Sequence, residues 1–433
     1  MRIAKWLLIG AGALLAALVL AALVLTQLVD PGRYKGVIER QVAAATGREF
    51  RLTGDIDLAF FPWLALTTGA AELPAPAGFD DPRFLAWREA HVGVRLLPLL
   101  RGELVVDRIR LVGLEAWLVR QADGRVNWAF DAAAGGATPQ AAPGAESSVL
   151  DSLPDIAGIE LRESRIAYVD VAAGSQLRLD DLRLDVEPVR AGTPMRISAA
   201  AVVSKTELAE RLSFELDARA TPGPPVLIEN AKLEGRLLGG RRFAAEGVPW
   251  QFAAPRLRYD AASGALDVPE WRLGFDQARI AGALSATLGD SPAAEGRLEL
   301  APVSLRATLA AAGVQLPPTR DRAAYGRASM AAGLRLSDGM LQIEPLDIQL
   351  DDTHLTGRVT RDAGEGDEAV IRFALHADRM DLDRYLKPED APSEPFVFPA
   401  AALKALRAEG TLEIDEGVLG GARLRGIRLG AEP

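Results

Sequence analysis

An internal repeat restricts the fold of this chain more than any other feature of its sequence. A pattern of apolar residues, with one glycine and one aspartate, starts at Leu266 and returns 75 positions later at Leu341. The matched pairs are Leu266/Leu341, Val268/Ile343, Trp271/Leu346, Leu273/Ile348, Phe275/Leu350, Asp276/Asp351, Ile280/Leu355, Gly282/Gly357 and Leu284/Val359. The same offset continues with Leu298/Phe373, Leu300/Leu375 and Leu305/Met380, and a looser third copy holds Leu177, Leu179, Leu182, Leu184 and Val186. Duplication of a structural unit explains this pattern better than chance.

The repeats consist of short runs in which apolar and polar residues alternate, as in Leu52, Gly54, Ile56 and Leu58. This period of two is typical of antiparallel strands with one buried and one wet face. Gly and Pro (41 and 27 of 433 residues) supply many turns. The sequence therefore predicts a mainly β fold of ~20 strands, with short helical or irregular pieces near residues 305–312 and 380–386. The alternation changes phase between Leu179 and Leu182, and again between Val268 and Trp271, which indicates a bulge or tight turn.

A sheet of stacked repeats carries one continuous apolar face, and few helices are available to cover it. With ~20 strands spaced ~4.8 Å apart, an elongated antiparallel sheet would extend on the order of 100 Å. We expect it to curl into an apolar groove, with lipid as the natural occupant. The pattern leaves open which strand face lines the groove. The candidate lining residues are Leu179, Leu182, Leu184, Val186, Val268, Leu273, Phe275, Ile343, Leu346, Ile348 and Leu350.

The amino-terminal region contains an uncharged stretch of 24 residues, 6–29. As a helix it would be ~36 Å long, which is enough to cross ~30 Å of hydrocarbon. Arg2 and Lys5 precede it, so the N-terminus should be cytoplasmic and the body should lie on the other side. A cleaved signal peptide is the alternative, but the stretch is longer than such apolar regions and lacks a small-x-small site at its end. We therefore expect a retained, single-pass anchor.

A second, amphipathic helix should follow Asp30-Pro31, because apolar residues then recur at helical spacing up to the stop signal Thr46-Gly47. It could pack on the protein body, which is the simpler expectation, or lie along a membrane surface. The apolar positions are Tyr34, Val37, Ile38, Val42 and Ala45.

The predicted organisation has six parts. A cytoplasmic stub (1–5) and the anchor (6–29) precede a helix-plus-β cap (30–130). An Ala-, Gly- and Pro-rich linker (131–149) then leads to the β-groove repeats (150–390), and residues 391–433 hold a second linker and a further β segment.

Composition excludes several kinds of chemistry. The net charge of −10 argues against broad nucleic-acid binding, and the absence of cysteine excludes disulfides, thiolate zinc sites and cysteine nucleophiles. The three histidines, His91, His354 and His376, are far apart in sequence, and neither a nucleophile elbow nor a phosphate loop is present. The acidic pairs Asp180-Asp181 and Asp351-Asp352 fit turns better than a glycosidase site. We therefore expect no enzyme and no cofactor.

Several short motifs, in order along the chain, resemble the AsmA-like proteins of Gram-negative bacteria. Those in the first part are Asp30-Pro31, Tyr34-Lys35, Thr46-Gly47-Arg48, Leu52-x-Gly54, Phe61-Pro62-Trp63, Leu96-Leu97-Pro98-Leu99-Leu100-x-Gly102 and Asp123-Gly124-x-x-Asn127-Trp128. Residues 350–357 (LDDTHLTG) and 380–386 (MDLDRYL) resemble the middle section of the same family.

The resemblance implies an inner-membrane anchor, a periplasmic body and a β-groove related to chorein-type lipid-transfer proteins. It also implies transport of phospholipid toward the outer membrane, or a role in outer-membrane assembly. Family members usually continue well past the segment resembling residues 410–417, so we expect a truncated C-terminal β segment. The alternative function is a scaffold that binds outer-membrane or envelope proteins through a sheet edge, with its apolar face covered.

Overall fold

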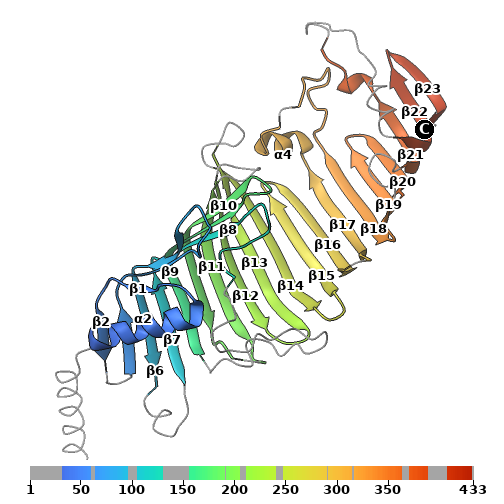
Figure 1. Cartoon of the computed structure of the whole chain (residues 1–433). Helices are drawn as coiled ribbons and strands as arrows, with labels where there is room; N and C mark the ends of the chain where they lie inside the picture. The colour runs from blue at the N-terminus through green and yellow to red at the C-terminus, as the bar shows by residue number, and fades with distance from the viewer. Residues whose placement is uncertain are drawn as a thin grey trace, which may run out of the picture. The chain divides into compact units, whose positions relative to one another are not determined.

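The computed structural model describes residues 32–59, 64–95, 105–129, 156–190, 192–204, 211–239, 247–289, 291–314, 316–362, 370–388 and 407–431. Within these residues the chain is mainly β, with 23 strands and few helices, as the sequence predicts. It divides into two compact units, unit 1 (Met1–Glu207) and unit 2 (Leu208–Pro433) (Figure 1).

Unit 1 begins with the helix α2 (Gly32–Thr46), which is followed by short strands and then by longer ones. The strands are β1 (Arg51–Leu52), β2 (Ile56–Ala59), β3 (Leu64–Thr68), β4 (Ala71–Pro74), β5 (Arg83–Trp87), β6 (Glu89–Val94), β7 (Val106–Val112), β8 (Glu115–Arg120), β9 (Ile156–Asp170), β10 (Ser175–Glu187) and β11 (Met195–Ser204).

The sheet of unit 1 forks at β9. The first half of β9 pairs with β7 and its second half pairs with β8, in both cases in parallel. One branch continues from β7 to β6, β3 and β2, and the other from β8 to β5, β4 and β1. On its other side, β9 pairs along most of its length with β10.

A hydrophobic core lies beneath α2. Ile38 and Val42 on the helix pack against a cluster of buried residues from the short strands: Phe50, Leu52, Ile56, Ala71, Leu73 and Phe84. The helix ends as the sequence predicts, since Gly47 has a φ of 69° and the Thr46 hydroxyl donates to the carbonyl of Val42 (2.7 Å). This predicted amphipathic helix therefore packs on the protein body, although Val37 remains half exposed.

Unit 2 is a sheet in which each strand pairs with its neighbours in the chain. Its strands are β12 (Arg211–Thr221), β13 (Val226–Leu238), β14 (Val248–Asp260), β15 (Ala265–Phe275), β16 (Ala278–Thr287), β17 (Ala293–Val303), β18 (Ala328–Ser337), β19 (Met340–Leu350), β20 (Thr353–Arg361), β21 (Ile371–Asp381), β22 (Ala408–Leu419) and β23 (Ala422–Ala431). The helix α4 (Leu305–Ala311) follows β17, and the 3-10 helix η3 (Asp383–Tyr385) follows β21. Both helices lie where the repeat predicts helical pieces.

The predicted antiparallel arrangement is wrong at three strand pairs. β7 and β8 each run parallel to β9, and β21 runs parallel to β22. In an antiparallel pair a short turn suffices, whereas a parallel pair needs a long connection that returns the chain to the same end of the sheet. The two Pro-rich stretches predicted as linkers lie in these connections, between β8 and β9 and between β21 and β22.

Among the described residues, no helix is both long and apolar enough to span a bilayer. The predicted anchor, residues 6–29, lies outside the described residues, as do the predicted linker 131–149 and the motifs at 61–63 and 96–102.

Candidate apolar binding face

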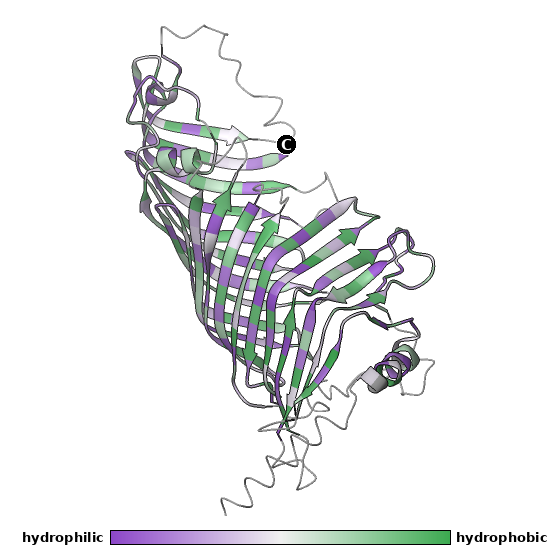
Figure 2. Ribbon diagram, turned by 90° about the vertical axis from the view of Figure 1, so that its left-hand side faces the viewer, coloured by the Kyte–Doolittle hydropathy of each residue, from purple (hydrophilic) through white to green (hydrophobic). Residues whose placement is uncertain are grey.

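Unit 2 carries an apolar row that crosses all of its strands. In this row each residue lies directly opposite the next on the neighbouring strand, so all of the side chains point to the same face. Hydrophobic and hydrophilic residues alternate along the strands (Figure 2). The apolar row consists of Leu216, Leu233, Phe252, Leu273, Ile280, Leu300, Met330, Ile348, Leu355, Ala377, Ile414 and Ile427.

A second row runs beside it on the same face. From β15 to β23, its residue on each strand lies two positions away from the residue of the apolar row. It begins at Trp271, whose ring lies over Gly282 so closely that an added Cβ there would be 2.4 Å from the ring. A glycine is therefore required at this position because the aromatic ring fills its space. The row consists of Trp271, Gly282, Leu298, Ala332, Leu346, Gly357, Leu375, Leu412 and Leu429.

The opposite face of the same strands is charged. The row that alternates with the apolar row consists of Asp217, Lys232, Ala253, Arg272, Ala281, Glu299, Ala331, Asp347, Thr356, His376, Glu413 and Arg428. Polar contacts cross this face, such as the ion pair of Arg428 with Glu413 (2.6 Å) and the hydrogen bond between His376 and Asp415 (3.1 Å). The sheet of unit 2 therefore has one polar face and one apolar face.

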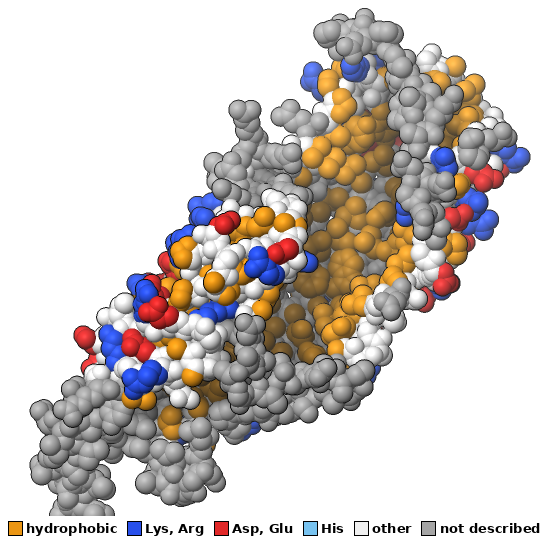
Figure 3. Space-filling model, in the orientation of Figure 1, with side chains coloured by type: hydrophobic (Ala, Val, Ile, Leu, Met, Phe, Trp, Pro, Cys, Tyr) orange, Lys and Arg blue, Asp and Glu red, His pale blue; other side chains and the backbone are white. Residues whose placement is uncertain are grey.

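The apolar face is not buried as a core would be. All but two residues of the apolar row, Ala377 and Ile414, keep an intermediate exposure, and both described clusters of mutually packed buried residues lie in unit 1. Over the middle strands of unit 2, hydrophobic side chains line a hollow (Figure 3). Extended apolar surfaces of this kind are candidates for binding sites.

Bulges keep the apolar residues on one face. Val268 and Trp271 are three positions apart, which would place them on opposite faces of a regular strand. The register of β15 against β16 shifts between them, so Val268 faces Leu284 and Trp271 faces Gly282. The register shifts in the same way between Ile343 and Leu346 on β19. The phase changes in the sequence thus mark bulges.

The hairpin β15–β16 and the hairpin β19–β20 pair identically, 75 residues apart. The third strand departs from the sequence alignment. Gly282 pairs with Leu298, whereas Gly357 pairs with Leu375, so the offset there is 77. The predicted pairs Leu298/Phe373 and Leu300/Leu375 are thus displaced by two residues. Strand alternation is unchanged by a shift of two, which is why the sequence pattern could not detect it.

The candidate groove residues of unit 2 share the apolar face: Val268, Leu273, Phe275, Ile343, Leu346, Ile348 and Leu350. In unit 1, Leu179, Leu182, Leu184 and Val186 also share one face of β10, across a bulge between Asp180 and Arg183. Val186 packs against a buried cluster, so it contributes to the core of unit 1. The groove residues chosen from sequence do not include Leu233, Phe252, Leu300, Met330, Leu355 and Ile414, although the same alternation marks each of them and the repeat already contains Leu300 and Leu355.

The acidic pairs have structural roles. Asp351 occupies the turn between β19 and β20, as predicted, whereas Asp180-Asp181 lies at the bulge inside β10 and not at a turn. A bulge suits this pair because Asp tolerates the φ of 52° that Asp181 adopts.

The two motifs of the middle section interlock at one end of unit 2. Asp351 accepts hydrogen bonds from the backbone N–H groups of Tyr325, Gly326 and Arg327 and from the Tyr385 hydroxyl (2.8 Å). Burial alone would raise the pKa of Asp351, but these hydrogen bonds outweigh it and hold the pKa below its ordinary value. Arg384 donates to Asp321 and Asp352 (2.7 Å each). The motif residues therefore attach η3 to the turn between β19 and β20.

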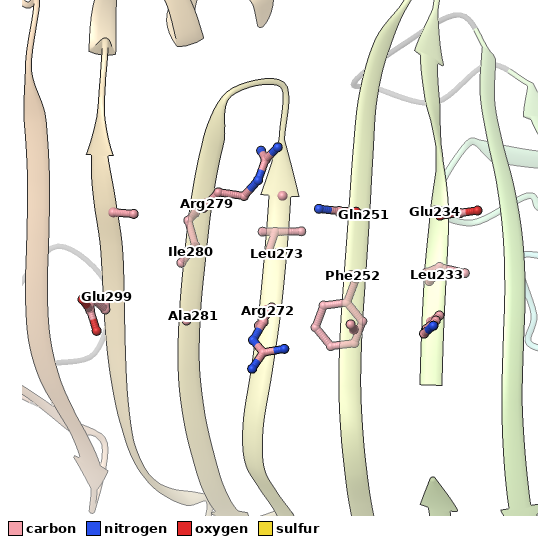
Figure 4. A pocket seen from close by; sticks show the side chains of 14 residues that line it. Leu233, Glu234, Gln251, Phe252, Arg272, Leu273, Arg279, Ile280, Ala281 and Glu299 are labelled. Carbon is pink, nitrogen blue, oxygen red and sulfur yellow. The ribbon is translucent and has the colours of Figure 1, made fainter. Parts of the chain in front are cut away.

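A hollow of about 500 Å³ lies along β13–β17, and residues of both the charged row and the apolar row line it (Figure 4). The charged side chains of Lys232, Glu234 and Glu299 lie among small residues in its lining. The Arg279 guanidinium donates to the carbonyls of Asp276 and Ala278 (2.7 and 2.8 Å), and Arg272 pairs with Glu270. The mixed charges of this hollow define no ligand.

The described fold and its apolar face define a repetitive, two-faced β-sheet protein. A model of the AsmA family matches residues 1–389, and the chain belongs to this family. None of the curated proteins matches it.

Proposed function

We propose that this protein is a non-enzymatic lipid-transfer protein that carries the acyl chains of phospholipids along the apolar face of unit 2. The observation that supports this function most strongly is the unbroken apolar row from Leu216 to Ile427, in register across every strand of the unit. Acyl chains would lie on this face while their headgroups stay in water.

The chemistry of such a face suits movement as well as binding. Burying one methylene group stabilises a complex by ~0.8 kcal/mol, so a whole acyl chain gains enough to leave a bilayer for the protein. Neighbouring residues of the apolar row are alike and ~4.8 Å apart, so an acyl chain that advances by one strand exchanges similar contacts. Transport along the row therefore needs no catalytic residue.

The membership of the AsmA family and the uncharged stretch at residues 6–29 support a location for this activity. In the proposed arrangement this stretch anchors the chain in the bacterial inner membrane, with the body in the periplasm. Phospholipid moves toward the outer membrane and supports its assembly. The partners are phospholipid, the inner membrane and envelope proteins, without nucleic acid.

The test is the phospholipid retained by the purified full-length chain, measured by lipid mass spectrometry. Leu273→Asp or Ile348→Asp places a carboxylate in the apolar row, where it costs several kcal/mol to desolvate, so bound phospholipid should fall at least ~10-fold. The matched control is Ala253→Asp, which adds the same carboxylate to the charged face between Lys232 and Arg272.

Equal lipid content in all three variants would contradict transfer along this face. A wild-type chain that is stable, monodisperse and free of lipid would favour the scaffold function instead.

A further inference from the structure

The strands of unit 2 divide into an aromatic group and an aliphatic group. The strands β12–β15 contain six Phe, Trp or Tyr residues, whereas β16–β20 contain none and β21–β23 contain only Phe373. The repeat does not produce this division, because Trp271 and Phe275 on β15 correspond to Leu346 and Leu350 on β19. We call the six residues of β12–β15 the aromatic section; they are Phe214, Trp250, Phe252, Tyr259, Trp271 and Phe275.

The whole aromatic section lies on the apolar face. Phe252 belongs to the apolar row, and Trp271 begins the second row. Tyr259 lies opposite Leu266, which is two residues before Val268 on β15, so it shares the same face. The other two aromatic residues on β14 and β15, together with that of β12, belong to a further row of residues that lie opposite one another: Phe214, Gly235, Trp250, Phe275 and Ala278.

The aromatic section is open to a ligand. All six residues keep an intermediate exposure, and none belongs to either described cluster of buried residues. An aromatic side chain can bury roughly 150–250 Å² and has few rotatable bonds, so it offers a large contact area at a low cost in conformational entropy. An apolar chain should therefore bind more tightly over β12–β15 than over the aliphatic strands that follow.

We infer that the aromatic section is the resting site of a phospholipid acyl chain on the apolar face. The inference rests on the proposed function and adds a location to it. A bound acyl chain spends most of its time over β12–β15 and crosses β16–β20 only in passing, because those strands present similar aliphatic side chains in succession.

Fluorescence quenching by phospholipid with brominated acyl chains tests this inference on the full chain. Bromine quenches indole fluorescence only at close range, and Trp250 and Trp271 are the two tryptophans of unit 2. Comparing the wild type with Trp250→Phe/Trp271→Phe isolates their signal, and Met330→Trp in that double variant reports on the aliphatic strands. With no more than one phospholipid per chain, the quenched fraction of Trp250 and Trp271 should be roughly 3-fold that of the Met330→Trp reporter.

Equal quenching of the two reporters would overturn the inference and leave the proposed function standing, since lipid would then bind without a preferred position. A chain that binds no phospholipid would overturn both.

A second pair of variants tests the aromatic section without a new reporter. Phe252→Leu/Phe275→Leu keeps the face apolar but removes aromatic contact area, so quenching of Trp250 and Trp271 should fall about 3-fold. The matched control is Leu288→Ala/Val314→Ala, which removes apolar side chains of unit 2 that are 50% and 49% exposed and lie outside its strands. Equal quenching in these two variants would also contradict a resting site on the aromatic section.

Discussion

Asn127 shows how one buried side chain can complete a sheet. It is fully buried, and its side-chain amide accepts from the N–H of Val119 (2.9 Å) and donates to the carbonyl of Trp117 (2.7 Å). The amide thus bonds to β8 as a neighbouring strand would. This role explains why the motif at residues 123–128 contains an asparagine, which the sequence alone marks only by its resemblance to AsmA-like proteins.

Replacing Asn127 by Ala should destabilise unit 1 by roughly 2–4 kcal/mol, because two partly buried backbone groups of β8 lose their hydrogen-bond partners. Chemical denaturation followed by circular dichroism measures this change. Gln176→Ala, at an exposed position of β10, is the control and should change stability by less than about 0.5 kcal/mol. A similar small effect for Asn127→Ala would show that water or another group replaces the amide.

At the scale of single elements, the bulge in β15 sets which of its residues lie on the apolar face. Deleting Pro269 removes the extra residue, so either Val268 or Trp271 must turn to the charged face. We expect this variant to lose most of its bound phospholipid and to become sensitive to proteases at β15. Pro269→Ala keeps the length of the strand and should behave as wild type. If the deletion variant retains its lipid and its protease resistance, the bulge does not control the face.

The strands and their faces could be predicted from sequence because each depends on local alternation. Leu273 and Ile348 were assigned to a shared apolar surface on that basis, and their pairing with Ile280 and Leu355 places them there. The parallel pairing of β9 with β7 and β8 could not be predicted, since it depends on where a long connection returns the chain. The hydrogen bonds that the Asp383 carboxylate accepts from the N–H groups of Gly420 and Gly421 could not be predicted for the same reason.

For the whole molecule, the two units should respond differently to lipid. The buried clusters beneath α2 and around Ile156 give unit 1 a core of its own, whereas the apolar row of unit 2 stays partly exposed. A ligand stabilises the part that it binds, by ~2.7 kcal/mol at 100 times its dissociation constant. Phospholipid should therefore slow hydrogen exchange in β13–β20 by up to ~100-fold. Exchange in the core strands of unit 1 serves as the internal reference and should not change. Equal slowing in both units would place the binding site elsewhere.

The strands of unit 2 pair with their neighbours in the chain, and this allows the length of the sheet to change during evolution. In unit 2, inserting or removing a pair of adjacent strands changes the length of the sheet without breaking a pairing between strands distant in sequence. The identical pairing of β15–β16 and β19–β20 is the mark of one such event. The sheet of unit 2 can therefore lengthen or shorten by whole pairs of strands, so its length is open to selection independently of the chemistry of its two faces.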